Sequence, residues 1–212
     1  LHDALPNCGV SDIHLYEMGS VFVTAEGRKQ PKEREMAAGV LTGSWNRPQW
    51  NAPSVPLDFF DGKGVLETLA ADLSIERFKL RPAELGWLQP GRAADVLVGG
   101  EVVGWLGEVH PLVLRTFEAD APVIAFEIDL ARIIHVAREA KALVEPARFP
   151  AVELDIAVVV PEEVTAEKLE QTIRSAGGKL LESVRLFDVY RGKGVQEGRK
   201  SLAARSEEHT SE

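Results

Sequence analysis

The chain has 212 residues, 45% of them hydrophobic and 27% charged, and its formal net charge is -9. This length allows one large or two small domains, and the composition is that of a soluble globular protein rather than one that coats DNA nonspecifically. The longest apolar runs are too short to cross a bilayer, no signal segment opens the chain, and the single Cys8 excludes an intrachain disulfide or a thiolate metal cluster.

The negative charge lies mainly in the first two thirds of the chain. Up to Ala147 there are 14 Lys and Arg against 21 Asp and Glu, whereas residues 148–204 hold nine of each sign. Contact with a nucleic acid is therefore expected in the later part. We also expect a cytoplasmic protein without membrane contact. Leu1 is not a methionine and the first ten residues show no natural beginning, so we expect a piece of a longer chain.

Residues 13–23 and 37–41 are apolar runs that predict two strands of one sheet, joined by a polar loop over residues 26–35. Trp45 and Trp50 follow, on either side of a turn that contains a proline. Two tryptophans at this spacing are more typical of a core lid or an interface than of a ligand site.

Two carboxylates, Asp58 and Asp61, lie where a helix is predicted to begin. The apolar face of this helix consists of Val65, Leu66, Leu69 and Leu73. A carboxylate here favours the unpaired amides of the first turn, so we expect a capping role. A catalytic or metal-binding pair is the alternative, but no histidine or further carboxylate is spaced to complete such a site.

The clearest local feature is a hairpin whose strands, residues 96–98 and 102–106, are joined by Gly99 and Gly100. Paired glycines permit the positive φ angles of a tight turn. A short strand is predicted before it, at residues 78–80.

Glu108 and His110 end this hairpin, and the proline after them suits the first turn of a short helix that runs to Phe117. A Glu-x-His pair is compatible with proton transfer, although no nucleophile accompanies it. Residues 123–130 predict another strand, and a short helix follows near residues 131–137.

The chain changes character at residues 138–150, which contain charged residues, alanines and two prolines. This composition indicates a connection between two domains, which we assign to residues 138–147. Beyond it we predict a buried strand at residues 156–160, a helix, and two strands at residues 180–190 and from Lys200 onward. The helix is expected to be capped by Thr165, to turn Leu169, Ile173 and Ala176 inward, to pair Glu170 with Arg174, and to stop at Gly177 and Gly178. The order β-α-β-β is the first two thirds of a ferredoxin-like unit, so the fold class is α+β.

The hairpin formed by the last two strands carries the strongest functional signal. Its glycine-rich connection and exit hold Arg191, Lys193, Arg199 and Lys200, opposed within that segment by Glu197 alone. Such a patch fits a polyanion, and a solvated loop is the alternative. The chain has no phosphate-loop, dinucleotide-binding, zinc-protease or nucleophile-elbow motif, and its five histidines are far apart, so catalysis by this chain alone is poorly supported.

Eight short motifs occur in a fixed order along the chain. They are Tyr-Glu-Met-Gly-Ser-Val-Phe at 16–22, Asp-Phe-Phe-Asp-Gly-Lys-Gly at 58–64, Pro-Gly-Arg-Ala-Ala at 90–94, Leu-Gly-Glu-Val-His-Pro at 106–111, Phe-Glu-Ile-Asp-Leu at 126–130, Arg-Phe-Pro-Ala-Val at 148–152, Asp-Ile-Ala at 155–157, and Leu-Phe-Asp-Val-Tyr at 186–190 with Lys-Ser-Leu-Ala at 200–203. In this order they resemble the C-terminal part of the bacterial phenylalanyl-tRNA synthetase β subunit.

The resemblance implies two domains. Residues 1–137 would form part of a catalytically inactive class II synthetase-like antiparallel sheet domain, which packs against the catalytic α subunit. Residues 148–204 would form a truncated ferredoxin-fold anticodon-binding domain, in which Asp188, Tyr190 and Ser201 contact the anticodon of phenylalanine tRNA. ATP and Mg²⁺ would belong to the α subunit, and the full-length protein would be part of an α2β2 heterotetramer acting as an aminoacyl-tRNA synthetase.

The side chains suit these roles, because a tyrosine offers a stacking face, and a carboxylate and a hydroxyl offer hydrogen bonds to a base edge. The four cations of the hairpin, Arg191, Lys193, Arg199 and Lys200, are expected to meet phosphate. An interaction scaffold for the α subunit with no direct tRNA contact is the alternative, and an independent enzyme using Glu108 and His110 is a third reading.

Three departures from the family pattern stand out. Gln89 occupies the place of a usual histidine, and Glu153 and Leu154 replace a basic pair. Residues 205–212 resemble the translation of a sequencing-adapter oligonucleotide, so we expect a non-native tail without structure after Ala204.

Overall fold

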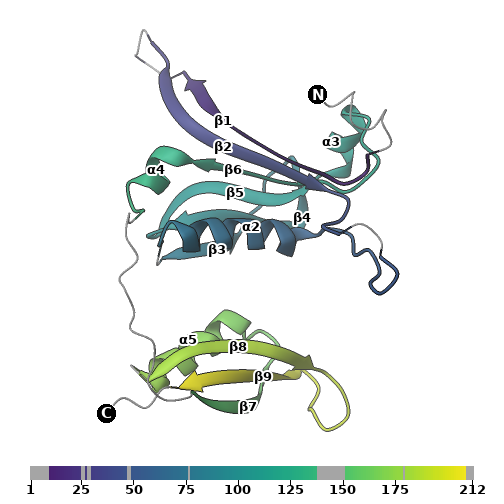
Figure 1. Ribbon diagram of the computed structural model, residues 1–212, viewed down its shortest axis with the longest axis vertical. Helices are drawn as coiled ribbons and strands as arrows, with labels where there is room; N and C mark the ends of the chain where they lie inside the picture. The colour runs from purple at the N-terminus through teal and green to yellow at the C-terminus, as the bar shows by residue number, and fades with distance from the viewer. Residues whose placement is uncertain are drawn as a thin grey trace. The chain divides into compact units, whose positions relative to one another are not determined.

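The computed structural model describes residues 10–24, 27, 30–46, 49–75, 77–137, 151–178 and 180–208. The chain divides into two compact units, Leu1–Ala142 and Leu143–Glu212, and each contains its own sheet (Figure 1). The connection predicted at residues 138–147 lies outside the described residues.

The first unit is built on a six-stranded antiparallel sheet. Its strands are β1 (Ile13–Val23), β2 (Lys32–Thr42), β3 (Phe78–Pro82), β4 (Leu88–Val98), β5 (Glu101–Val109) and β6 (Ile124–Asp129). They lie in the order β1-β2-β6-β5-β4-β3. Helix α2 (Phe59–Asp72) lies along one face of the sheet (Figure 1), and the short helices α3 (Pro111–Thr116) and α4 (Leu130–Ile134) follow β5 and β6.

The core of this unit lies between α2 and the sheet. Leu66 of α2 is buried against a sheet face that carries Leu106, Ile124 and Ile128, all almost inaccessible to solvent. Alternation along each strand puts these apolar residues on one side, and the 3.6-residue period of the helix turns Leu66 toward them. The predicted helix face is thus largely confirmed, although Leu69 is 37% exposed.

Of the two hairpins predicted in this unit, one has the expected turn and the other has a longer strand than expected. Gly99 and Gly100 join β4 to β5 with φ angles of 62° and 95°, as expected. The other prediction was wrong at one end, because β2 begins at Lys32 and the charged residues 32–35, assigned to a loop, pair with β1. The hydrogen bonds between two strands join main-chain groups, so charged residues can continue a strand if their side chains reach solvent.

The second unit has the predicted order of elements, with β7 (Val152–Pro161), α5 (Ala166–Gly177), β8 (Leu181–Tyr190) and β9 (Arg199–Glu208). The strands form an antiparallel sheet in the order β7-β9-β8. Thr165 caps α5 by accepting a hydrogen bond from the backbone N–H of Lys168, and Gly178 ends the helix with a φ of 59°. The predicted pair of Glu170 and Arg174 forms at 2.8 Å.

Three expectations for this unit were wrong. Ile156 is 38% and Val159 50% exposed: Val159 lies opposite Ser201 on the sheet face away from the buried Leu202 and Ala204, and α5 packs mainly against β8 and not over β7, where Ile156 lies. Ala176, expected to point inward, is exposed. Residues 205–208, expected to lack structure, continue β9 opposite both neighbouring strands, and Ser206 is only 1% exposed.

Candidate nucleic-acid interface

The two faces of the three-stranded sheet differ in burial. Leu202, Ala204 and Ser206 alternate along β9 and are buried, so they mark the covered face. Ser201 and Ala203, which alternate with them, project from the other side, the open face. This face belongs to β7, β8 and β9 together.

The register of β8 and β9 brings the predicted anticodon residues together on the open face. Tyr190 lies opposite Ser201, and Asp188 lies opposite Ala203. Opposite residues of an antiparallel pair point to the same side of the sheet. Asp188, Tyr190 and Ser201 therefore share one face, within two positions of each other along the strands.

A β-bulge in β8 makes this arrangement possible. Leu186 lies opposite the buried Ala204, and the register shifts by one residue before Asp188. With strict alternation, Leu186 and Asp188 would point to the same face of the sheet. Because Phe187 is an extra residue in β8, Asp188 points to the opposite face instead. The bulge thus leaves Leu186 on the covered face, where it is half-buried, and turns Asp188 and Tyr190 to the open face.

Tyr190 is held where the strand meets the glycine-rich loop. Its hydroxyl donates a hydrogen bond to the backbone carbonyl of Lys193 at 3.3 Å, and the ring remains 47% exposed. A Cβ at Gly192 would lie 2.7 Å from the Tyr190 hydroxyl oxygen, so a larger residue there would displace the tyrosine side chain. The tyrosine is positioned and still offers part of its surface.

The four predicted phosphate contacts fall into two groups. Glu162, which follows β7, accepts a hydrogen bond from Arg191 Nε at 3.0 Å. Lys200 Nζ donates to the backbone carbonyl of Glu162 at 2.7 Å, and its side chain is only 13% exposed. The side chains of Lys193 and Arg199 have no ion pair within the described part of the chain.

Electrostatics at Glu162 follow from this pairing. The hydrogen bond from Arg191 holds the pKa of the Glu162 carboxyl below its usual range, and the same contact raises the pKa of Arg191. Sequence reasoning missed Glu162 because it stands 29 positions before Arg191. No signal in the sequence points to it, because the pairing of Pro161 with Arg199, which brings Glu162 to the loop, is formed only in the fold.

An ion cluster occupies the far part of the open face. Arg205 binds Asp155 through Nε at 2.7 Å and Glu153 at 3.2 Å. The guanidinium lowers the pKa of Asp155 and its own pKa is raised. It also lies over the ring of Phe187, 5.8 Å from the ring centroid.

The carboxylates at the start of α2 have the predicted capping role. Asp58 accepts from the backbone N–H of Phe60, and Asp61 accepts from the backbone N–H of Asp58, each at 2.7 Å. Trp45 Nε1 donates to Asp61 at 2.8 Å. Across the ranges that the structure describes, no three His, Cys, Asp or Glu side chains gather to hold a metal ion.

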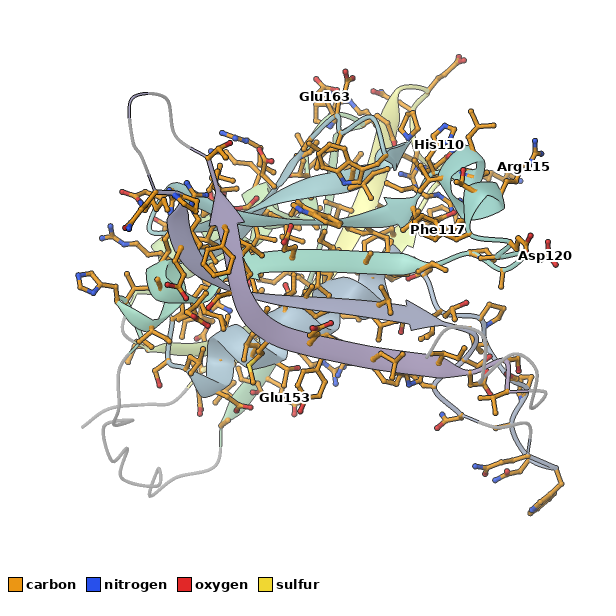
Figure 2. The ribbon with its side chains drawn as sticks, turned by 90° about the horizontal axis from the view of Figure 1, so that it is seen from above. His110, Arg115, Phe117, Asp120, Glu153 and Glu163 are labelled. Atoms are coloured by element: carbon orange, nitrogen blue, oxygen red, sulfur yellow. The ribbon has the colours of Figure 1, made fainter. Side chains whose placement is uncertain are left out.

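Glu108 and His110 are engaged by different partners. Glu108 binds Arg92, and His110 Nδ1 accepts a hydrogen bond from the backbone N–H of Leu112 at 3.1 Å, which caps α3. Figure 2 shows His110 at the start of this helix. Both side chains thus have structural partners, and nothing in the geometry joins them as a proton-transfer unit.

The two tryptophans near α2 differ from the expectation of a core lid. Trp45 is half exposed and lies against His14, with ring centroids 4.6 Å apart. Trp50 is 98% exposed. Of the two expected roles, core lid or interface, the core lid is wrong for Trp50: a bridge between Ser44 and Pro56 closes the base of its segment, and a bridge between Gln49 and Ala52 closes the turn that holds Trp50.

None of the helices in the described ranges is both long and apolar enough to cross a bilayer.

Comparison with known proteins gives the chain a family. Residues 6–130 match the family described as Phenylalanyl tRNA synthetase beta chain CLM domain, and residues 147–210 match the Ferredoxin-fold anticodon binding domain. The chain is 44% identical over 200 residues to the Phenylalanine--tRNA ligase beta subunit of Symbiobacterium thermophilum, covering 94% of this chain and 22% of that protein. It is 40% identical over 194 residues to the corresponding subunit of Bacillus subtilis, covering 90% and 24%.

The chain therefore spans less than a quarter of the length of these curated relatives. Its first family match covers more than half of its own residues, and its second covers the unit that carries the open face. By both matches, the chain belongs to the phenylalanyl-tRNA synthetase β-chain family and carries that family's ferredoxin-fold anticodon-binding domain.

Proposed function

We propose that the chain is a noncatalytic part of a phenylalanine–tRNA ligase β subunit whose second unit binds the anticodon region of phenylalanine tRNA. The observation that carries the proposal is the register of β8 and β9, with its bulge, which gathers Asp188, Tyr190 and Ser201 on one open sheet face. A sheet face with an exposed aromatic side chain is a common way to bind unpaired bases of RNA.

Each side chain has a distinct part in this interaction. The Tyr190 ring stacks on a base, Asp188 accepts hydrogen bonds from base N–H groups, and Ser201 can donate or accept. Lys193 and Arg199 are exposed and meet the flanking phosphates. Arg191 and Lys200 hold the loop to Glu162 and contribute less to phosphate binding.

ATP-dependent phenylalanylation belongs, in this proposal, to the catalytic α subunit together with its Mg²⁺, in an α2β2 assembly in the cytoplasm. On the sheet of the first unit, Arg81 is bound to Asp95, and Glu127 accepts a hydrogen bond from Trp105 Nε1 at 3.1 Å. Each of these two acidic side chains therefore already has a partner on the sheet.

The test uses the full-length β subunit with its α subunit and a phenylalanine tRNA anticodon stem-loop. Tyr190→Ala is expected to weaken binding by about 1–3 kcal/mol, the usual value of one stacked base. Tyr190→Phe keeps the stacking face and should bind nearly as well as the wild type. Tyr16→Ala is the matched control, since Tyr16 is 78% exposed on β1 in the other unit. Unchanged binding by Tyr190→Ala would refute the anticodon role.

A scaffold that packs on the α subunit without contacting tRNA is the second candidate. The nearly complete exposure of Trp50 favours it, because tryptophan is enriched among the residues that dominate protein interfaces. Association with the α subunit together with a tRNA footprint that leaves Lys193 unprotected would support this reading over the first.

A further inference from the structure

The bulge that turns Asp188 to the open face also places a second aromatic ring there. Phe187 is the extra residue of the bulge, and its side chain is 49% exposed. Its ring meets the Arg205 guanidinium, and Arg205 lies opposite Asp155 and Arg185 in the open-face register. Phe187 therefore projects from the same side of the sheet as Tyr190.

A hollow of about 410 Å³ adjoins this ring. It is lined by Glu153, Ser183, Arg185, Phe187, Arg205 and Glu207. Two of its carboxylates are engaged, since Glu207 accepts from Ser183 Oγ at 2.8 Å and Glu153 binds Arg205. Arg185 is exposed and has no ion pair among the residues that the structure describes.

The aromatic and basic side chains around this hollow suit a nucleotide. An exposed aromatic ring stacks on any base, and the Arg205 guanidinium, 5.8 Å from the ring centroid, adds a cation beside the ring. Arg185 supplies a cation beside the ring for the phosphate. Phe187 and Tyr190 are three positions apart on one strand, roughly 10 Å at 3.3 Å per residue, so two different bases are needed to reach both rings.

We propose that Phe187 is a second stacking platform, which binds an unpaired base next to the one held by Tyr190, while Arg185, on the side of Phe187 away from Tyr190, meets the outer phosphate of that nucleotide. This inference rests on the proposed function of the open face. It adds a binding site for a further nucleotide of a single-stranded RNA loop and gives the bulge a direct role in ligand contact.

The experiment uses the full-length β subunit with its α subunit and anticodon stem-loops that carry 2-aminopurine at one loop position at a time. Stacking on a ring quenches the fluorescence of this base analogue. Phe187→Ala and Phe187→Leu should each weaken RNA binding roughly 5- to 150-fold and abolish quenching at one loop position. Phe187→Tyr keeps the ring and should retain both properties.

Matched controls come from α3, where Figure 2 labels Phe117 and Arg115. Phe117 is 66% exposed, and Phe117→Ala should leave RNA binding unchanged. Arg185→Gln should reduce the slope of log affinity against log salt by about 0.7, the value of one phosphate contact to a single strand, whereas Arg115→Gln should not change it.

The outcomes separate the two proposals. If Tyr190→Ala weakens binding and Phe187→Ala leaves both affinity and quenching at wild-type values, the second platform is refuted and the anticodon role stands. If neither variant changes binding, both proposals fail. If Phe187→Leu and Phe187→Tyr bind equally well, the side chain acts by its bulk and not by stacking, and the second platform is likewise refuted.

Discussion

Glu162 decides which cations of the hairpin loop are available to a polyanion. It engages Arg191 through its carboxylate and Lys200 through its backbone carbonyl, and so ties the segment after β7 to the loop between β8 and β9. Lys193 and Arg199 remain exposed. Two cations of the loop therefore hold its structure, and two are exposed to solvent.

Removing the Glu162 charge is expected to strengthen RNA binding. Glu162→Gln frees Arg191, so the slope of log affinity against log salt should become steeper by about 0.7 for each further phosphate that is neutralised. Binding of the anticodon stem-loop at several salt concentrations measures this slope. Glu163→Gln removes the same charge from the next, exposed residue, which Figure 2 labels, and should have a smaller effect. Equal slopes for the two variants would contradict the division of charge.

The same pair makes stability depend on pH in one direction. The pKa of Glu162 is lower in the folded protein than its ordinary value of 4.5, so the pair stabilises the fold fully above that value. The contribution is lost as the pH falls through the lower, folded pKa. Melting temperatures measured between neutral and acidic pH should therefore fall less steeply for Glu162→Gln than for Glu163→Gln.

In each unit, one residue determines how an element packs or which of its side chains are exposed. The bulge at Phe187 sets which side chains of β8 reach the open face. In the first unit, α2 approaches the sheet closely because Gly62 has no side chain: a Cβ there would lie 2.6 Å from Ile124 Cγ2 and 2.8 Å from Leu106 Cδ1. Gly64, in the same helix, has nothing within 4 Å of such an atom.

These two glycines are expected to respond oppositely to alanine. Gly62→Ala overpacks the core and should lower the free energy of unfolding by about 1–3 kcal/mol. Gly64→Ala should raise it by about 0.5–1 kcal/mol, because alanine loses less backbone entropy in a helix. Denaturant unfolding followed by tryptophan fluorescence measures both, since all four tryptophans lie in the first unit. A stabilising Gly62→Ala would show that α2 shifts freely on the sheet.

The two units of the molecule differ in charge and in the surfaces that they expose. The first unit carries most of the net negative charge, which disfavours RNA, whereas the second has the open face and the basic loop. The projecting segment around Trp50 belongs to the acidic unit and is a natural place for a protein partner. The division agrees with a β subunit that contacts protein and tRNA through different surfaces.

Assembly with the α subunit is expected to depend on Trp50. Trp50→Ala should weaken the association by at least about 2 kcal/mol, or roughly 30-fold, if the indole is a central interface residue. Phe22→Ala is the control, because Phe22 is also exposed on this unit, on β1. Sedimentation of the full-length subunits mixed over a range of concentrations measures the affinity. Undiminished assembly of Trp50→Ala would remove Trp50 from the interface.

The sequence by itself determined the order of elements in both units, the hairpin at Gly99 and Gly100, and the caps at Asp58 and Thr165. These features depend on neighbours in the chain: apolar periodicity, positive φ angles, and side chains that reach the first turn of a helix. The ordered motifs also identified the family and the residues of the candidate site, whose role stays a prediction.

Only the tertiary structure decided which side chains of β8 share a face, which cations Glu162 engages, and how far β2 and β9 extend. Each of these depends on residues distant in sequence. Strand register depends on which side chains the rest of the fold buries and on the connecting turn, and one extra residue at Phe187 reverses the faces of the residues after it. An ion pair across 29 positions has no local signal, because the fold alone brings Glu162 to Arg191.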